Sequence, residues 1–221
     1  MQIGFLLFPE VTQLDFTGPL QFLSRLPGSE TSLIAKSLDP IKTDTPMRIL
    51  PTHTFETAPK LDLLCVPGGF GTTAAIADNE TLDYVRKTGP EVEYVTSVCT
   101  GALILGAAGL LEGKNATTHW AYTDLLELCG ATHVDERVVR DGNTFTGGGG
   151  TAGIDFALTV IAAIKGEAMA QSLQLGLEYD PSPPYDAGHP SKAPDKILRA
   201  LKPLYENPLE SAAEAIKAAR N

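Results

Sequence analysis

Residues 61–66 and 92–97 are short apolar runs, and each leads through a glycine-containing turn into a helical pattern. Runs of this length between turn residues are typical of strands that are buried on both faces of a sheet. Parallel strands need a crossover connection between them, which is usually a helix. The pattern therefore predicts an α/β fold in which helices cover both faces of a mostly parallel sheet.

The other predicted elements follow the same alternation. Strands are expected at residues 3–8 and 31–35, and a helix is expected to begin near Thr17, Gly18 and Pro19 and to end near residue 26. The rest of the prediction comprises edge strands or a hairpin within 36–60, a strand at 116–118, a helix at 120–129, a strand pair at 134–139 and 144–146, a helix at 153–164, a proline-rich loop or lid at 178–194, and helices at 194–204 and 208–219. No repeat or linker divides the chain, so we expect one domain over residues 1–221 with a helical extension from about residue 190.

Charge and cysteine content limit the possible partners and the compartment. The formal net charge is −10, which makes nucleic acid and anionic membranes poor partners. Cys65, Cys99 and Cys129 are too few and too widely spaced for a disulfide framework or a zinc ribbon. The apolar N-terminal run lacks a basic flank and is too short for a signal sequence or a membrane span. These features predict a cytoplasmic protein, and the spacing of its four histidines does not suggest a metal site.

Cys99 stands where a predicted strand ends and a predicted helix begins. A sharp bend of this kind lifts a side chain out of the sheet edge and points backbone N–H groups at whatever binds there. A cysteine at a helix N-terminus is expected to have a lowered pKa and hence more of the reactive thiolate. The local pattern allows two roles for Cys99: it is a nucleophile, or it is a small buried residue of the core.

Asp15 and His119 follow other predicted strands and could share the edge with Cys99. Asp15 would act there as a general acid and base, or it would simply cap a helix. His119 would form a dyad with the thiol, or it would hydrogen-bond to the backbone, and Trp120 beside it would belong to the core. Gly68 and Gly69 offer backbone donors after the 61–66 strand, or form an ordinary tight turn.

Several segments together resemble the ThiJ/PfpI superfamily, whose members have a flavodoxin-like doubly wound α/β fold. The resemblance covers about residues 1–190, and its most specific part is the segment around Cys99. The segments that carry it are 14–19, 66–69, 97–102, 116–120 and 147–155. Membership of this superfamily implies that Cys99 is the nucleophile.

Within that superfamily the chain most resembles the isocyanide hydratases. Thr100 stands where the protease-like branch has histidine, and Asp15 stands where the deglycase-like branch usually has glutamate. A third branch carries a helix-turn-helix module, for which the last helices here are too short and too acidic. Gly150 departs from the pattern, because relatives commonly have a larger apolar residue there.

This resemblance implies a cysteine-dependent hydro-lyase that adds water to an isocyanide and forms an N-substituted formamide. Cys99 would form a covalent thioimidate, Asp15 would act as general acid and base, and Thr100 would orient the site. Residues expected near the substrate or the developing charge are Gly68, Gly69, Gly148 and Trp120. The scheme calls for no metal and no organic cofactor, and family members often form homodimers. Two alternatives stay open, a module that senses oxidation or binds a small ligand through Cys99, and a deglycase or glyoxalase that acts on reactive carbonyls.

Overall fold

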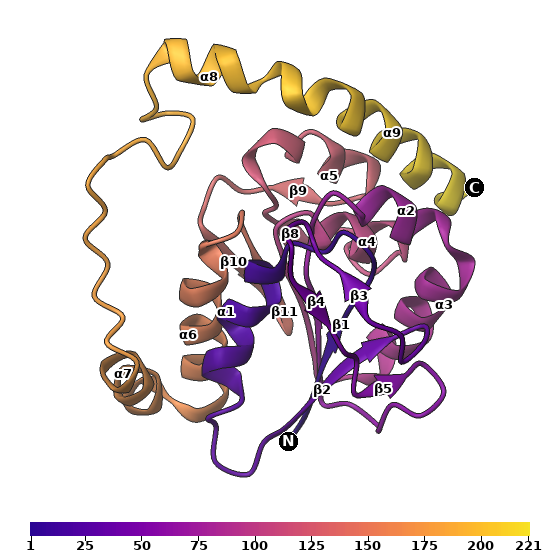
Figure 1. Cartoon of the computed structure of the whole chain (residues 1–221), viewed down its shortest axis with the longest axis vertical. Helices are drawn as coiled ribbons and strands as arrows, with labels where there is room; N and C mark the ends of the chain where they lie inside the picture. The colour runs from indigo at the N-terminus through magenta and orange to yellow at the C-terminus, as the bar shows by residue number, and fades with distance from the viewer.

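A seven-stranded sheet forms the centre of the computed structural model, which describes all 221 residues (Figure 1). Its strands run in the order β10-β11-β7-β6-β1-β2-β5, and every neighbouring pair is parallel except β10 and β11. The strands are β1 Gln2–Leu6, β2 Glu30–Ala35, β5 His53–Thr54, β6 Leu63–Val66, β7 Tyr94–Val98, β10 Val138–Asp141 and β11 Thr144–Gly147. The predicted mostly parallel α/β sheet is therefore confirmed.

Two small sheets accompany the central one. The antiparallel pair of β3 Ile41–Lys42 and β4 Arg48–Ile49 confirms the short strands predicted within residues 36–60. The parallel pair of β8 Asn115–Ala116 and β9 Thr132–His133 lies beside β10, the edge strand of the central sheet. β8 precedes the segment that carries His119, so this small sheet helps to place that side chain.

Helices cover both faces of the central sheet (Figure 1). On one side, α6 Ala152–Lys165 packs between α1 Gln13–Leu23 and α7 Glu167–Gly176. The other side carries α2 Thr72–Ala77, α3 Asn79–Thr88, α4 Gly101–Ala107, the short α5 Leu125–Leu128 and the C-terminal α9 Pro203–Arg220. The strands between these layers are continuously apolar because both of their faces are buried, as in β6, where all four residues are buried.

The start of α1 was predicted wrongly. The helix begins at Gln13 rather than near Thr17, and Pro19 lies inside it. An internal proline removes one backbone hydrogen bond, here the bond to the carbonyl of Asp15. The ring compensates by packing closely on α6, where a Cβ added to Gly153 would stand 3.0 Å from the Pro19 ring. Tertiary packing therefore outweighs the local signal, and Asp15 lies in the first turn of the helix.

The predicted helix at 120–129 and the two C-terminal helices also differ from the structure. A short 3-10 helix, η2 Trp120–Tyr122, and α5 replace the single helix at 120–129. Helix α8 Asp195–Leu201 is followed by α9, which continues through Pro208, and α7 had not been predicted. No helix is long and apolar enough to span a bilayer.

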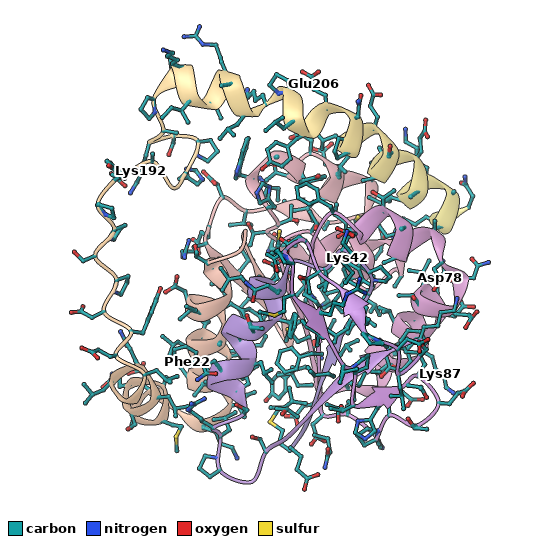
Figure 2. All side chains as sticks on the ribbon, viewed as in Figure 1. Phe22, Lys42, Asp78, Lys87, Lys192 and Glu206 are labelled. Carbon is teal, nitrogen blue, oxygen red and sulfur yellow. The ribbon has the colours of Figure 1, made fainter.

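The proline-rich loop predicted at 178–194 is present as an extended segment, which we call the strap. It leaves α7 and leads to α8 along one side of the body (Figure 1), which it meets again where Nε2 of His189 lies 3.2 Å from Oδ1 of Asp135. Lys192 near its end stands apart from the packed side chains of the body (Figure 2). Its first part is held to the body, because the Tyr179 hydroxyl donates to Oδ1 of Asp155 over 2.9 Å and the Tyr179 ring meets Phe22 of α1 edge-on.

Candidate active site

Cys99 occupies the bend between β7 and α4 with a φ of 58°. This left-handed conformation costs a non-glycine residue about 1–2 kcal/mol, so the surroundings must enforce it. The Cys99 N–H donates to the carbonyls of Gly147 (3.0 Å) and Gly148 (2.9 Å), and the Cys99 carbonyl accepts from the Thr118 hydroxyl over 2.8 Å. The backbone is thus fixed on both sides, and the thiol projects at the carboxyl edge of the sheet.

Two glycines allow the chain to pass close to this bend. A Cβ added to Gly101 would stand 2.0 Å from the carbonyl oxygen of Val66, at the end of the neighbouring strand. A Cβ added to Gly68 would stand 2.5 Å from both the backbone nitrogen and the hydroxyl oxygen of Thr100. Only glycine, which has no Cβ, allows such close approaches, so the geometry of the bend requires glycine at both positions.

Asp15 presents a fully buried carboxyl group to the same place. Its Oδ2 accepts a hydrogen bond from the Gly68 N–H over 3.0 Å, whereas its Oδ1 is buried without a hydrogen-bond partner. Burial raises the pKa of Asp15 from 3.8 to about 7, although the nearby Cys99 thiol and the Gly68 N–H lower this pKa in part. Asp15 therefore titrates near neutral pH, which suits a group that both gives and takes a proton.

The expected lowering of the Cys99 pKa was wrong. The side chain is only 8% exposed, and burial raises the pKa of the thiol well above its ordinary value, with the nearby Asp15 charge adding to the effect. The backbone N–H groups of Thr100 and Gly150 lower the pKa of Cys99, but by less. Burial thus outweighs the helix N-terminus, so the thiol keeps its proton near neutral pH, where the Asp15 carboxyl group titrates.

Both groups line one cavity of about 230 Å³. Its walls come from segments that follow the carboxyl ends of β1, β6, β7 and β11, together with residues of η2 and the start of α9. The lining residues are Thr12, Asp15, Gly69, Phe70, Cys99, Thr100, His119, Tyr122, Gly150 and Tyr205. The cavity therefore brings together a thiol, a carboxyl group that titrates near pH 7 and an aromatic wall.

Thr100 and Gly69 both line the cavity, but their polar groups are already engaged. The Gly69 N–H donates to the Thr100 hydroxyl over 3.0 Å, and that hydroxyl also lies 2.7 Å from the hydroxyl of Thr72. Thr100 thus ties the turn after β6 to the bend after β7. Its backbone N–H and that of Gly150 are the two that interact with the thiol.

Gly68, Gly148 and Trp120 contact the site from outside the cavity. The Gly68 N–H donates a hydrogen bond to the Asp15 carboxyl group, and the Gly148 carbonyl accepts one from the Cys99 N–H. Trp120 and Gly148 instead line a larger hollow of about 1610 Å³ between the body and the strap. Gly68 and Gly148 therefore support the reacting groups, whereas Trp120 is half-buried against His119 and Tyr205 and does not belong to the core, where it was expected.

His119 follows the backbone-bonding interpretation. Its Nδ1 accepts a hydrogen bond from the Ala121 N–H over 3.3 Å and caps η2. Burial lowers the pKa of His119 from 6.5 to about 4, so the ring is neutral near pH 7 and carries its proton on Nε2. No group of three or more His, Cys, Asp or Glu side chains is placed to hold a metal ion.

Sequence reasoning missed five residues of the cavity: Thr12, Phe70, Tyr122, Gly150 and Tyr205. Gly150 had drawn notice only as a departure from a family pattern. Phe70 adjoins the recognised Pro-Gly-Gly turn, so its position gave a usable signal. Tyr205 comes from the C-terminal helix, and no local pattern could connect it with Cys99.

Comparison with known proteins gives consistent results. The model of the DJ-1/PfpI family matches residues 1–163. An isonitrile hydratase of Pseudomonas putida is 56% identical over 198 residues, which cover 90% of this chain and 87% of that protein. The crystal structure of a ThiJ/PfpI family protein from Pseudomonas syringae superposes with a TM-score of 0.95 at 43% identity, covering 97% of this chain and 90% of that one. The HTH-type transcriptional regulator CdhR of Pseudomonas aeruginosa is 30% identical over 173 residues, but these cover only 51% of the regulator.

Proposed function

The chain belongs to the DJ-1/PfpI family, and we propose that it is an isocyanide hydratase, a lyase that converts an isocyanide and water into an N-substituted formamide. The observation that carries this proposal is the shared cavity of Asp15 and Cys99. The reaction needs a nucleophile and a group that exchanges a proton near neutral pH, and this pair offers both. The 56% identity to an isonitrile hydratase supports the same conclusion.

In the first step, the sulfur of Cys99 attacks the terminal carbon of the isocyanide. Asp15 takes the thiol proton as the sulfur attacks and passes it to the same carbon, which gives a covalent thioimidate. Asp15 is left as a carboxylate in a buried environment, where its charge is disfavoured and its basicity is high. The N–H groups of Thr100 and Gly150 stabilise negative charge on the sulfur as it reacts.

In the second step, the Asp15 carboxylate takes a proton from water as the water oxygen attacks the thioimidate carbon. Asp15 passes this proton to the nitrogen, the tetrahedral adduct collapses, and the carbon–sulfur bond breaks as the formamide leaves. The hydroxyl proton of the adduct returns through Asp15 to the sulfur, which restores the Cys99 thiol and the Asp15 carboxylate. The overall balance is one isocyanide and one water to one formamide, and every step is carried by Cys99 and Asp15.

The raised pKa of Cys99 argues against a sensor of oxidation. Susceptibility to oxidation follows thiolate character and exposure, and this thiol has a raised pKa and is nearly buried. Catalysis does not need a standing thiolate, because the Asp15 carboxyl group in the same cavity can take the thiol proton as the isocyanide is attacked. We therefore favour catalysis over sensing.

We also propose that the protein is a cytoplasmic homodimer. Free thiols at Cys65, Cys99 and Cys129 fit a reducing compartment. The large hollow beneath the strap and the exposure of Tyr185 (81%) and Leu175 (83%) fit a surface that a second copy covers. Sedimentation equilibrium at micromolar concentration tests the dimer, and a mass of one chain throughout would contradict it.

Turnover of phenyl isocyanide, followed in the ultraviolet, tests the proposed reaction. We expect the native protein to form N-phenylformamide, and Cys99→Ala and Asp15→Asn each to lower the rate at least about a thousandfold. Cys129→Ala is the matched control, because this buried thiol lies outside the cavity. A folded, reduced native protein that hydrates no isocyanide would overturn the proposal.

A further inference from the structure

Tyr205, on the first turn of α9, lines the cavity together with Cys99 and Asp15. Its ring centroid lies 5.3 Å from that of His119 and 5.9 Å from that of Tyr122, and the Tyr122 ring meets it edge-on. These spacings are those of favourable aromatic pairs. The C-terminal helix therefore supplies one ring of an aromatic wall, to which the segment after β8 adds His119 and Tyr122 and the turn after β6 adds Phe70.

Helix α9 is anchored so that this ring keeps its place. Ala212 and Ile216 of α9 are buried in the core, and the Arg220 guanidinium donates to the Gly106 carbonyl of α4 over 2.9 Å and pairs with Glu112. Since α4 begins immediately after the Cys99 bend, α9 is fastened to the same element that positions the nucleophile. Glu206, the next residue after Tyr205, lies on the outer side of α9 (Figure 2).

The lining of the cavity defines the chemistry that it accepts. Four of its ten residues carry rings, namely Phe70, His119, Tyr122 and Tyr205, and none is lysine or arginine. His119 adds no positive charge near neutral pH, because burial lowers its pKa to about 4. The volume of about 230 Å³ is below the roughly 300–1,000 Å³ typical of sites for drug-sized ligands. The cavity thus favours a compact, uncharged substituent with a flat apolar face.

We propose that Tyr205 is a specificity-determining residue that selects isocyanides with a compact, uncharged aromatic substituent. This inference rests on the proposed function. An isocyanide group is linear, so a substrate whose terminal carbon meets the Cys99 sulfur directs its substituent away from that sulfur. The substituent then contacts the aromatic wall, of which Tyr205 is the member contributed by the C-terminal tail.

The test compares phenyl isocyanide with methyl isocyanide in the native protein, Tyr205→Ala and Tyr205→Phe. We expect Tyr205→Ala to lower kcat/KM about tenfold for the phenyl substrate and only about twofold for the methyl substrate, mostly through KM. Tyr205→Phe keeps the ring and should stay within about twofold of the native protein for both. Leu204→Ala, a truncation of an exposed neighbour on the same turn, is the matched control.

A binding measurement keeps this test independent of turnover. Calorimetry on Cys99→Ala with N-phenylformamide as probe should show about tenfold weaker binding when Tyr205→Ala is added, whether or not the native protein hydrates isocyanides. An equal loss for both substrates, or unchanged binding of the probe, would overturn the role of Tyr205. Probe binding that depends on Tyr205 in a protein without hydratase activity would instead contradict only the proposed function.

Discussion

The Gly68 N–H donates a hydrogen bond to Oδ2 of Asp15 over 3.0 Å, while Oδ1 of the same carboxyl group is buried with no partner. Half of the carboxyl group is therefore fixed in place, and the other half is left free to react beside Cys99. A buried carboxylate that is only partly hydrogen-bonded is costly, which is why the pKa of Asp15 rises to about 7. The arrangement lowers the free energy of unfolding at neutral pH, but it provides a carboxyl group that can exchange a proton there.

Asp15→Asn should stabilise the fold while it abolishes turnover. In the native protein the pKa of Asp15 is raised from 3.8 to about 7, so between about pH 4 and pH 7 the folded state binds more protons than the unfolded state. The stabilising contribution of the protonated carboxyl group is complete below about pH 4 and is lost as the pH rises to 7. An asparagine side chain does not ionise, so it causes no such loss of stability, and its amide oxygen can still accept the hydrogen bond from the Gly68 N–H.

Urea denaturation at several pH values measures this effect. The free energy of unfolding of Asp15→Asn should exceed that of the native protein by about 2–4 kcal/mol at pH 8 and should approach it near pH 4. Asp39→Asn, which removes an exposed carboxylate, is the control for net charge. A difference that does not change with pH would contradict the raised pKa.

Thr100→Val should destabilise the protein because it leaves two polar groups without their partner. The Gly69 N–H and the Thr72 hydroxyl both bond to the buried Thr100 hydroxyl. We expect a loss of about 1–3 kcal/mol in the free energy of unfolding, whereas Thr100→Ser, which keeps the hydroxyl, should lose less than about 1 kcal/mol. Equal stability of the two variants in urea denaturation would show that the hydroxyl network is not needed.

Gly68→Ala should lower turnover through the position of the Cys99 bend. The new Cβ would stand 2.5 Å from Thr100 and 3.0 Å from Cβ of Cys99, so the backbone there must move. A shift of about 1 Å at reacting groups can cost about a hundredfold in rate, and we expect a loss of that size in kcat. Gly176→Ala meets no neighbouring atom and should leave kcat unchanged. Native turnover by Gly68→Ala would refute the close approach.

Ile216→Ala should destabilise the whole protein and not only the tail. Ile216 is fully buried in the same core cluster as the central strands, so a cavity there should cost about 2–5 kcal/mol. If residues 1–221 form one domain, unfolding followed by circular dichroism and by tryptophan fluorescence should show one shared transition at a lower urea concentration. Lys217→Ala, on the exposed side of α9, is the control. Two separate transitions would show that the tail unfolds independently.

Sequence patterns located the centre of the site because they are local. The bend at Cys99, the turn at Gly68 and the position of Asp15 all follow predicted strands, and parallel strands bring their carboxyl ends to one edge. The positions of these residues therefore predicted that they share one edge of the sheet, whereas the cavity itself is visible only in the structure. The resemblance to a known superfamily added the reaction.

Other features depended on tertiary context. The pKa of Cys99 was predicted to fall, because a helix N-terminus is visible in sequence while the depth of burial is not. Helix α1 begins before Thr17 because the packing of Pro19 on Gly153 compensates for the lost hydrogen bond. Tyr205 reaches the cavity because the strap, α8 and α9 lead the chain back to it, and hydrophobic periodicity does not predict this path.

Rapid-quench mass spectrometry during turnover of phenyl isocyanide tests the central claim most directly. We predict that the intact protein gains the mass of one isocyanide at a rate at least equal to kcat, that the adduct maps to Cys99, and that Cys99→Ala gains no mass. In Asp15→Asn the adduct should form no faster than in the native protein, because the group that transfers the proton is missing. Formation of N-phenylformamide while Cys99 stays unmodified, or an adduct confined to Cys65 or Cys129, would contradict the covalent mechanism.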